Sequence, residues 1–410
     1  MFKRKKYYEI KLWLETDDII VIHGSRQTGK TTLLKLFMQD FPENNFEYFD
    51  LEDSRFLEIC EQGYENVINY LRQKGLLKQQ KRFYLLIDEI QYLQNPSSFL
   101  KLLHDHYPEI KLIVTGSSSF EIKSKFKDSL VGRTLNFELY PLDFEEFIVF
   151  KKRKYNLREY ISSEIIIDDL DKLYREYIIY GGYPKIVLAE TILMKEKYLQ
   201  QIIDTYIKSD IRDLAKIRHI DKFNKLLRVL ASQSGELLNI NELSNTAKIA
   251  KQTVEQYLFI LENTYIIQLV KPFSKNVRSE LFKTPKIFFI DTGILNMLNL
   301  KYLPKEISGN TFETSVFSEF LKNIKKENIN YWRTQDKKEI DFVIFQKNIS
   351  SLFEVKINAH KFKKTPMKYF ASKYKPQNMN CISLTGKLSE NNLSIKNIKP
   401  WDLYAEYFTF

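Results

Sequence analysis

A chain of 410 residues, of which 44% are hydrophobic and only 12 are glycine, is long enough for two or three compact domains. Its two cysteines, Cys60 and Cys381, stand far apart, which excludes a cysteine-based zinc site and fits a reducing cytoplasm. No run reaches the roughly 18 apolar residues of a membrane helix, and the basic first residues lack the apolar core of a signal peptide. We therefore expect a cytoplasmic protein without membrane contact.

The net charge of +11 is unevenly distributed along the chain. Residues 1–190 contain 28 Lys and Arg against 30 Asp and Glu, a net −2, and residues 191–410 contain 35 against 22, a net +13. A basic second half favours a phosphate-rich partner such as DNA. Solvated surface lysines are the alternative, and charge alone does not separate the two.

Residues 17–40 predict a phosphate-binding loop. Apolar residues 19–22 indicate a buried strand, and residues 33–37 have the spacing of a helix. The eight residues from Gly24 to Thr31 fit G-x-x-x-x-G-K-[ST] in full, and such a loop turns backbone N–H groups onto phosphate oxygens. We expect Lys30 to reach the β- and γ-phosphates of ATP and the Thr31 hydroxyl to bind Mg²⁺. The predicted nucleotide-binding residues of this loop are Gly24, Ser25, Arg26, Gln27, Thr28, Gly29, Lys30, Thr31 and Thr32.

An apolar strand at 83–87 is followed by two acids, Asp88 and Glu89. At the carboxyl edge of a parallel sheet, Asp88 would hold the Mg²⁺ shell, and Glu89 would orient or deprotonate the attacking water. The strand predicted at 111–115 ends in hydroxyl residues, of which Thr115 or Ser117 could sense the γ-phosphate. A serine-rich turn is equally compatible with these hydroxyls.

Strands and helices alternate in residues 1–140. Helices are predicted in 1–16, 54–78 and 97–107, and further strands at 46–50 and 135–139. This alternation predicts an α/β fold with a parallel sheet.

The motifs GSRQTGKTTLL (24–34), LLIDEIQ (85–91), VTGSSS (114–119), LVGRT (130–134), YPLDFEEF (140–147) and GGYP (181–184) resemble those of AAA-type P-loop ATPases of bacteria and archaea that carry a C-terminal domain of unknown function. The resemblance implies a P-loop sheet of about five strands with a helical lid. It implies that Arg133 helps to read the γ-phosphate, either in its own subunit or in a neighbour's, and the second alternative would require an oligomer. It also implies that Pro184 packs near the base, with a helix-ending turn as the alternative.

Residues 142–210 are mostly helical by pattern and would form the lid. A helix at 222–233, two helices within 239–263 and a strand from 265 resemble a winged helix. The residues at the exposed start of its second helix, Lys248, Lys251, Gln252 and Thr253, would contact DNA. Packing or protein contact is the alternative for this module.

After a connector at 284–300, a helix from 309 to 322 and strands at 329–333, 339–345 and 352–356 resemble the restriction-endonuclease-like PD-(D/E)xK core. Asp341 and Glu354 would converge on Mg²⁺, and Lys356 would position water or stabilise charge. Glu313 is a further candidate metal ligand, and Glu319 is a weaker one. Ile340 replaces the proline of the motif. A nuclease-like fold that binds without cutting is the alternative.

The sequence thus predicts four domains: a P-loop ATPase core at 1–140, a helical lid at 141–215, a winged helix at 216–283 and a nuclease-like α/β domain at 284–410. The expected function is a Mg·ATP-dependent switch coupled to a basic half that binds nucleic acid or protein. The alternatives are an ATP-regulated, metal-dependent DNA nuclease and a non-enzymatic binding module.

Overall fold

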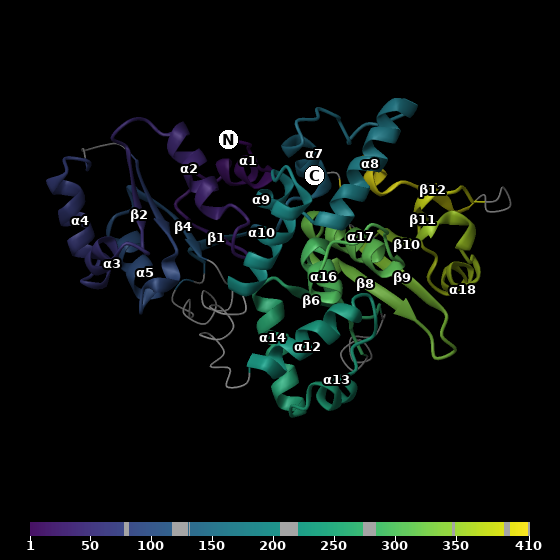
Figure 1. Ribbon diagram of the computed structural model, residues 1–410. Helices are drawn as coiled ribbons and strands as arrows, with labels where there is room; N and C mark the ends of the chain where they lie inside the picture. Colours follow the sequence, from purple (N-terminus) through teal and green to yellow (C-terminus); the bar gives the residue numbers. More distant parts are fainter. Residues whose placement is uncertain are drawn as a thin grey trace. The chain divides into compact units, whose positions relative to one another are not determined.

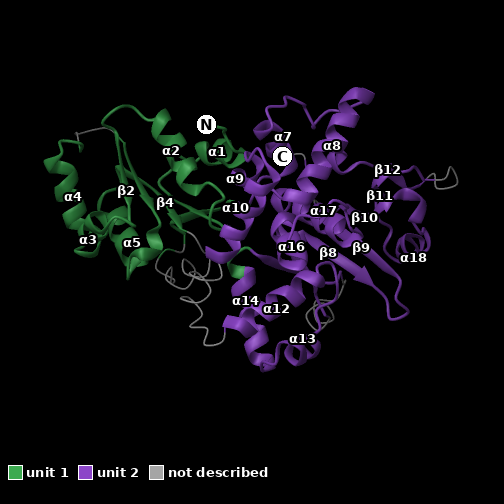
Figure 2. Cartoon of the chain, viewed as in Figure 1, with its two compact units in different colours: residues 1–140, 263–265 green, residues 141–262, 266–410 purple. Residues whose placement is uncertain are grey.

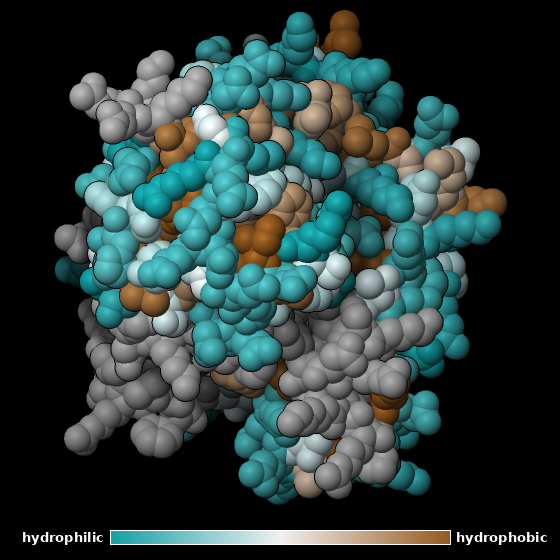
Figure 3. Space-filling model, turned by 90° about the vertical axis from the view of Figure 1, so that its left-hand side faces the viewer, coloured by the Kyte–Doolittle hydropathy of each residue, from teal (hydrophilic) through white to brown (hydrophobic). Residues whose placement is uncertain are grey.

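The computed structural model describes residues 1–77, 82–116, 130, 132–205, 220–273, 284–346, 349–388 and 394–408. The chain forms two compact units (Figure 2). Unit 1 comprises residues 1–140 and 263–265, and unit 2 comprises residues 141–262 and 266–410. None of the helices in the described ranges is both long and apolar enough to span a bilayer. The face seen in Figure 3 is mostly hydrophilic, and its hydrophobic residues lie in small separate groups.

Unit 1 contains a five-stranded sheet in the order β2-β3-β4-β1-β5, with every neighbouring pair parallel (Figure 1). The predicted parallel α/β sheet of about five strands is therefore confirmed. The strands are β1 (Ile19–His23), β2 (Phe46–Asp50), β3 (Phe83–Asp88), β4 (Ile110–Gly116) and β5 (Thr134–Glu138).

Helices cover both faces of this sheet because side chains alternate along each strand. Ile20 and Ile22 pack with α1 (Lys5–Lys11) and α2 (Lys30–Asp40). Ile19 and Val21 lie in the core on the opposite face, which is covered by α3 (Ser54–Glu61), α4 (Tyr64–Gln73) and α5 (Pro96–His106). The helical stretch expected at 54–78 is split, because Gly63 adopts φ +110 between α3 and α4.

Unit 2 begins with helices. They are α7 (Phe144–Phe150), α8 (Glu164–Tyr180), α9 (Pro184–Val187), α10 (Ile192–Thr205), α12 (Ile220–Ser232), α13 (Ile240–Ala247) and α14 (Lys251–Asn263). The helices expected at 222–233 and within 239–263 are thus present. Lys248, with φ +54, ends α13, and the buried residues of α12 to α14 share one hydrophobic core.

Strand β6 (Ile267–Val270) pairs with β7 (Lys286–Phe289) in an antiparallel ribbon, and α16 (Thr292–Leu300) follows. The interpretation of 284–300 as a connector is therefore wrong, since Lys286–Phe289 form a fully buried strand. The domain boundary expected after residue 283 falls within this ribbon. Residues 274–283, which were expected to belong to the wing, lie outside the described ranges.

A second sheet has the order β12-β11-β10-β9-β8. Its elements and those around it are α17 (Gly309–Asn323), β8 (Ile329–Arg333), β9 (Glu339–Gln346), β10 (Ile349–Asn358), α18 (Thr365–Tyr374), β11 (Asn378–Thr385), β12 (Lys396–Ile398) and α19 (Leu403–Glu406). Strands β8 to β10 are antiparallel, and β10 to β12 are parallel. Phe370 of α18 packs on one face, and Phe320 of α17 packs against Phe342 and Phe353.

Candidate functional site

The predicted phosphate-binding loop runs from the end of β1 to the start of α2. Gly24 follows His23, and a Cβ added to Gly24 would lie 2.1 Å from the carbonyl oxygen of Leu139. Gly29 ends the loop with φ +99, a conformation that glycine adopts at low cost. Lys30, Thr31 and Thr32 form the first turn of α2, so the backbone N–H groups at this helix start can face an anion.

The Lys30 ammonium lies inside this loop. Its Nζ donates to the carbonyl oxygens of Gly24 at 3.0 Å and of Ser25 at 3.1 Å, and only 5% of the residue is exposed. The Thr28 hydroxyl donates to the same Ser25 carbonyl at 2.8 Å. The cation is therefore positioned by its own loop, where phosphate oxygens could replace the two carbonyls as acceptors.

Asp88 is 2% exposed and accepts hydrogen bonds at both carboxylate oxygens. Tyr48 donates its hydroxyl to Oδ2 at 2.9 Å, and the Thr115 hydroxyl donates to Oδ1. Burial and the nearby Asp88 carboxylate raise the pKa of Tyr48 far above its usual value, so the phenol stays a donor. Sequence reasoning missed Tyr48, although its place on the strand beside β3 could have indicated it.

Glu89 lies just beyond the end of β3 in a left-handed conformation, φ +55. Its backbone N–H donates to the Thr115 hydroxyl oxygen at 3.2 Å, and the Gln91 amide donates to its carboxylate. Thr115 thus contacts both acids and orients them. Ser117, the other hydroxyl predicted to sense the phosphate, lies outside the described residues.

The donor set fits the Mg²⁺ ion of a bound nucleotide. No group of three or more His, Cys, Asp or Glu side chains able to hold a metal ion occurs in the described part of the chain. Mg²⁺ carried by a nucleotide needs only one or two protein ligands, because phosphates and water supply the rest. Thr31 and Asp88 are the residues that would hold it.

Arg133 lies at the opposite edge of the sheet from the phosphate-binding loop. Its carbonyl oxygen accepts from the N–H of Ile19, the first residue of β1, at 2.8 Å. The loop follows the last residue of β1, which at about 3.3 Å per residue is roughly 15 Å away. The guanidinium pairs with Asp105, with Nε 2.9 Å from Oδ1. Arg133 could act on the nucleotide of its own subunit or on that of a neighbouring subunit. Its distance from the loop disfavours the first alternative.

Further polar side chains of unit 1 contact the phosphate-binding loop or the residue before it. Arg4 donates to the carbonyl oxygens of Thr28 and Tyr140, each at 2.9 Å. His23 Nδ1 bonds the hydroxyl of Tyr265, which also lies 3.3 Å from a carboxylate oxygen of Glu138. These contacts were not anticipated, because Tyr265 is 241 positions beyond Gly24 and no motif connects them.

The GGYP segment (residues 181–184) forms hydrogen bonds with other residues of unit 2. The Gly182 N–H donates to Asp291 at 2.7 Å, and its carbonyl oxygen accepts from the Leu142 N–H at 2.7 Å. A Cβ added to Gly182 would lie 2.2 Å from the Leu142 carbonyl oxygen. Burial raises the pKa of Asp291. The close approach of Gly182 to Leu142 explains why a glycine is needed there. Pro184 is the first residue of α9. A contact between Pro184 and the nucleotide stays a prediction.

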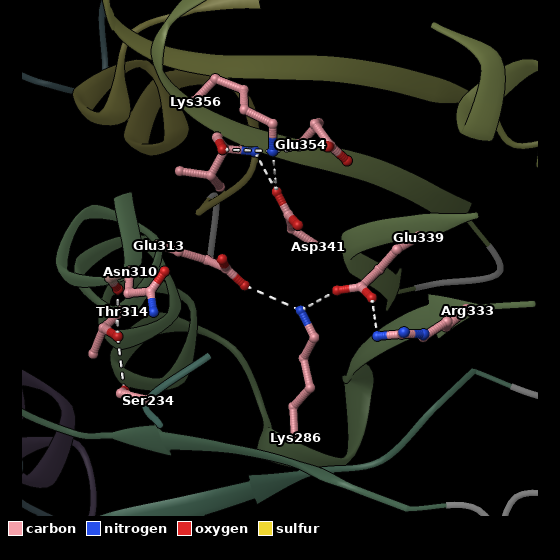
Figure 4. A network of polar contacts seen from close by, with 11 residues as sticks. Ser234, Lys286, Asn310, Glu313, Thr314, Arg333, Glu339, Asp341, Glu354 and Lys356 are labelled. Atoms are coloured by element: carbon pink, nitrogen blue, oxygen red, sulfur yellow. Dashed lines mark hydrogen bonds and ion pairs between the residues drawn. The ribbon is translucent and has the colours of Figure 1, made fainter. Parts of the chain in front are cut away.

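Figure 4 shows the acids and lysines of unit 2. Asp341 and Glu354 lie on the neighbouring strands β9 and β10 and share the Lys356 ammonium, at 3.2 Å and 2.8 Å. Asp341 also accepts the Val355 N–H at 2.8 Å. The three residues predicted from the nuclease-like motif are therefore brought together.

Burial and the Asp341 carboxylate raise the pKa of two neighbouring acids. The pKa of Glu354 rises to about 8 and that of Glu313, on α17, to about 7. One oxygen of Glu354, Oε2, is buried without a hydrogen-bond partner among the described residues. Oxygen donors of this kind are the type that Mg²⁺ or Mn²⁺ prefers, but in the described residues three such acids are not arranged to hold an ion.

Lys286 of β7 was not anticipated in this group. Its Nζ lies 3.2 Å from Glu313 and 2.6 Å from Glu339, which also pairs with Arg333 at 2.8 Å. Glu319, the weaker candidate, does not join these acids. It accepts from the Phe144 N–H and from the hydroxyls of Tyr177 and Tyr404. Six positions beyond Glu313 on α17, it belongs to a separate buried group.

Comparison with protein-family models divides the chain into three parts. Residues 16–148 match an AAA domain, and residues 171–305 and 308–404 match two domains of unknown function, DUF8612 and DUF4143. An uncharacterized protein of Haemophilus influenzae is 27% identical over 88% of this chain and 89% of its own length. An uncharacterized protein of Methanocaldococcus jannaschii is 29% identical over 83% of this chain and 75% of its own length.

Among solved structures, AMPPCP-bound DnaA from Aquifex aeolicus is 18% identical, with a TM-score of 0.26, over 63% of this chain and 87% of that one. The ORC2 protein of Aeropyrum pernix in its ADP form is 12% identical, with a TM-score of 0.32, over 65% and 84%. With TM-scores this low, neither structure carries weight. Residues 16–148 thus resemble an AAA-type P-loop domain in both the family match and the loop geometry, and this resemblance suggests nucleotide binding.

Proposed function

We propose that the protein binds and hydrolyses Mg·ATP in unit 1 and passes its nucleotide state to the basic second half of the chain. The observation that carries this proposal is the buried Lys30 ammonium, held by two carbonyls within a complete phosphate-binding loop at the end of β1. In this mechanism, Lys30 and the loop N–H groups bind phosphate oxygens, and Glu89 orients the attacking water. Bound Mg²⁺ neutralises phosphate charge, and Thr31 and Asp88 would hold it.

Purified protein assayed for ATP binding and phosphate release, with and without Mg²⁺, tests this proposal. Binding should be measurable without hydrolysis when Glu89 is changed to Gln. Parent protein that binds no nucleotide in the presence of Mg²⁺ would overturn it.

A second candidate function is metal-dependent cleavage of nucleic acid by a nuclease-like domain in unit 2. The contacts that favour it are those of Asp341 and Glu354 to Lys356, together with the buried, unpartnered Glu354 Oε2. Asp341, Glu354 and Glu313 would hold the ion, which supplies charge stabilisation when bound, and Lys356 would position water. Plasmid DNA incubated with Mn²⁺ tests it. Cutting should stop in each of Asp341→Asn, Glu354→Gln and Lys356→Ala.

A third candidate function is binding without cleavage, through a winged helix and the surface beyond β10. Lys248, Lys251 and Gln252 are exposed around the start of α14, with Thr253 half-buried. No acidic residue occurs between Glu354 and Glu390, and seven lysines in this stretch are exposed, at 361, 363, 364, 368, 373, 375 and 387. Among the described residues, none of the seven forms an ion pair with a carboxylate. DNA affinity that falls steeply with salt supports this role, because each neutralised phosphate releases counterions. Absence of binding at low salt favours a protein partner.

A further inference from the structure

Lys286 lies at the centre of the acid–lysine group in Figure 4, although it comes from a different sheet. It begins β7, and its side chain is 3% exposed. Its ammonium bridges Glu313 of α17 and Glu339 of β9, at 3.2 Å and 2.6 Å. It also lies 5.6 Å from the centre of the Tyr331 ring. A buried cation with this set of partners is well fixed.

The main chain holds Lys286 from both sides. Val270 of β6 pairs with it on one side, and on the other Leu237 forms a bridge with it. The next residue, Ile287, bonds through its N–H and carbonyl to Glu236 and Gly235, at 3.1 Å and 2.7 Å. These contacts come from the segment between α12 and α13 and from the strand after α14. A movement of α12, α13 or β6 would therefore also move the Lys286 ammonium.

The two lysines of the group divide the carboxylates between them. Lys356 takes Asp341 and Glu354, and Lys286 takes Glu313 and Glu339. In the described part of the chain, no three His, Cys, Asp or Glu side chains are arranged so that they could hold a metal ion. An ammonium group and a divalent cation compete for the same carboxylate oxygens, since each satisfies the same negative charge. Each of the four acids thus already has an ammonium partner within the chain.

We propose that Lys286 is an internal cation that competes with a divalent metal ion for Glu313, so that the β6–β7 ribbon gates metal binding at the Asp341–Glu354 site. The inference rests on the second candidate function, since it needs that metal site. When β7 carries Lys286 away, Glu313 becomes available beside Asp341 and Glu354, and three carboxylates can face one ion. With Lys286 in place, metal binding is weak. The ribbon follows the helix–turn–helix in the chain, so a ligand that moves those helices changes metal affinity.

The test measures Mn²⁺ binding to the full chain without nucleotide, from the electron paramagnetic resonance signal of free Mn²⁺. Lys286→Met removes the charge and keeps the stem, whereas Lys286→Arg keeps the charge. Lys338→Met is the matched control, because Lys338 pairs with Asp336 at the surface. We expect Lys286→Met to bind one Mn²⁺ with a Kd at least about tenfold below that of the parent, and the gain to vanish when Asp341→Asn is added. The Lys286→Arg and Lys338→Met proteins should behave as the parent does.

Two results of this titration would contradict the proposed gating by Lys286. They differ in whether the metal site itself is also ruled out. Equal Mn²⁺ affinity of the parent and Lys286→Met, lost with Asp341→Asn, would leave the metal site standing without a gate. No Mn²⁺ binding to either protein would remove the metal site as well.

A second measurement uses the parent protein and does not depend on the folding of a variant. Amine acetylation, followed by peptide mass spectrometry, reports how exposed each lysine is. Saturating Mn²⁺ should speed the acetylation of Lys286 several-fold, because the displaced ammonium reaches solvent, and should leave Lys338 unchanged. Acetylation of Lys286 that stays slow at saturating Mn²⁺ would overturn the proposal.

Discussion

The phosphate-binding loop of unit 1 and the acid–lysine group of unit 2 both bury charged side chains, but they balance the charge differently. In unit 1, the Lys30 ammonium is held by neutral carbonyl groups of Gly24 and Ser25. In unit 2, Lys286 and Lys356 are held by four carboxylates. The bonds from Lys30 to these carbonyls can be exchanged for bonds to an incoming anion, whereas the ammonium groups of unit 2 form ion pairs with carboxylates.

If both proposed sites bind their ligands, we expect them to respond differently. A phosphate that enters the loop would replace the carbonyl oxygens of Gly24 and Ser25 as acceptors from Lys30. A metal ion entering the unit 2 group must compete with two ammonium groups, so unit 2 requires a rearrangement. The predictions below test this difference, from the largest expected effect to the smallest.

Lys30→Ala should give the largest effect. It removes the buried cation of the phosphate-binding loop, and we expect ATP hydrolysis to fall at least about 100-fold, with ATP binding lost or strongly weakened. Isothermal titration calorimetry and a phosphate-release assay measure the two. Lys35→Ala is the matched control, since Lys35 lies on the same helix and is exposed. Hydrolysis by Lys30→Ala at the parent rate would show that the loop is not the nucleotide site.

Glu89→Gln should separate binding from turnover. The amide keeps the shape of the side chain and the contact with Gln91 but cannot accept a proton, so hydrolysis should slow by about 100-fold or more. ATP affinity should stay within about twofold of the parent, since Asp88 and Lys30 are untouched. Glu65→Gln, at an exposed position of α4, controls for loss of a carboxylate. A Glu89→Gln protein with full turnover would assign the base to another residue.

These two sites also differ in how far the sequence predicted them. The P-loop strand, loop and helix are contiguous, and their geometry depends on local rules such as the positive φ of Gly29, so residues 19–40 were predicted well. Asp341, Glu354 and Lys356 were brought together as expected, because alternation along paired strands fixes their side.

What the sequence could not supply is the long-range partner of each charge. Tyr48, Tyr265 and Lys286 come from elements with no motif of their own, and only tertiary packing brings them to the sites. The apolar strand at Lys286–Phe289 was interpreted as a connector for the same reason: a four-residue strand gives too short a pattern to assign, and its pairing partner β6 lies beyond residues 274–283.

Arg133→Ala tests whether unit 1 is complete within one subunit. Because Arg133 lies at the far edge of the sheet, we expect its loss to lower hydrolysis by about tenfold or more only where subunits assemble. Arg55→Ala, an exposed arginine paired with Asp53, is the control. Mixing Arg133→Ala with Glu89→Gln should restore activity, since one interface then has both an intact Glu89 and an intact Arg133. Activity that is not restored, and that does not change with protein concentration, would rule out supply by a neighbouring subunit.

Glu354→Gln should give the smallest effect, a change in the pH dependence of stability. Burial and Asp341 raise the pKa of Glu354 from 4.5 to about 8, so the folded state binds this proton more tightly than the unfolded state does. The stabilisation from the proton is complete below pH 4.5 and is lost as the pH rises towards 8. One pKa unit corresponds to about 1.4 kcal/mol, which makes the loss a few kcal/mol at most.

Glutamine cannot lose a proton, so Glu354→Gln should resemble the parent at pH 5 and unfold at a higher temperature than the parent at pH 9. Thermal unfolding of both proteins at several pH values measures the difference. Glu327→Gln is the matched control, because Glu327 is exposed just before β8 and should leave the pH profile unchanged. Parallel profiles for Glu354→Gln and the parent would mean that Glu354 is ionised throughout, fully compensated by Lys356. Glu354 would then be an ionised partner of Lys356 at every pH tested, and the pH dependence expected of unit 2 would be absent.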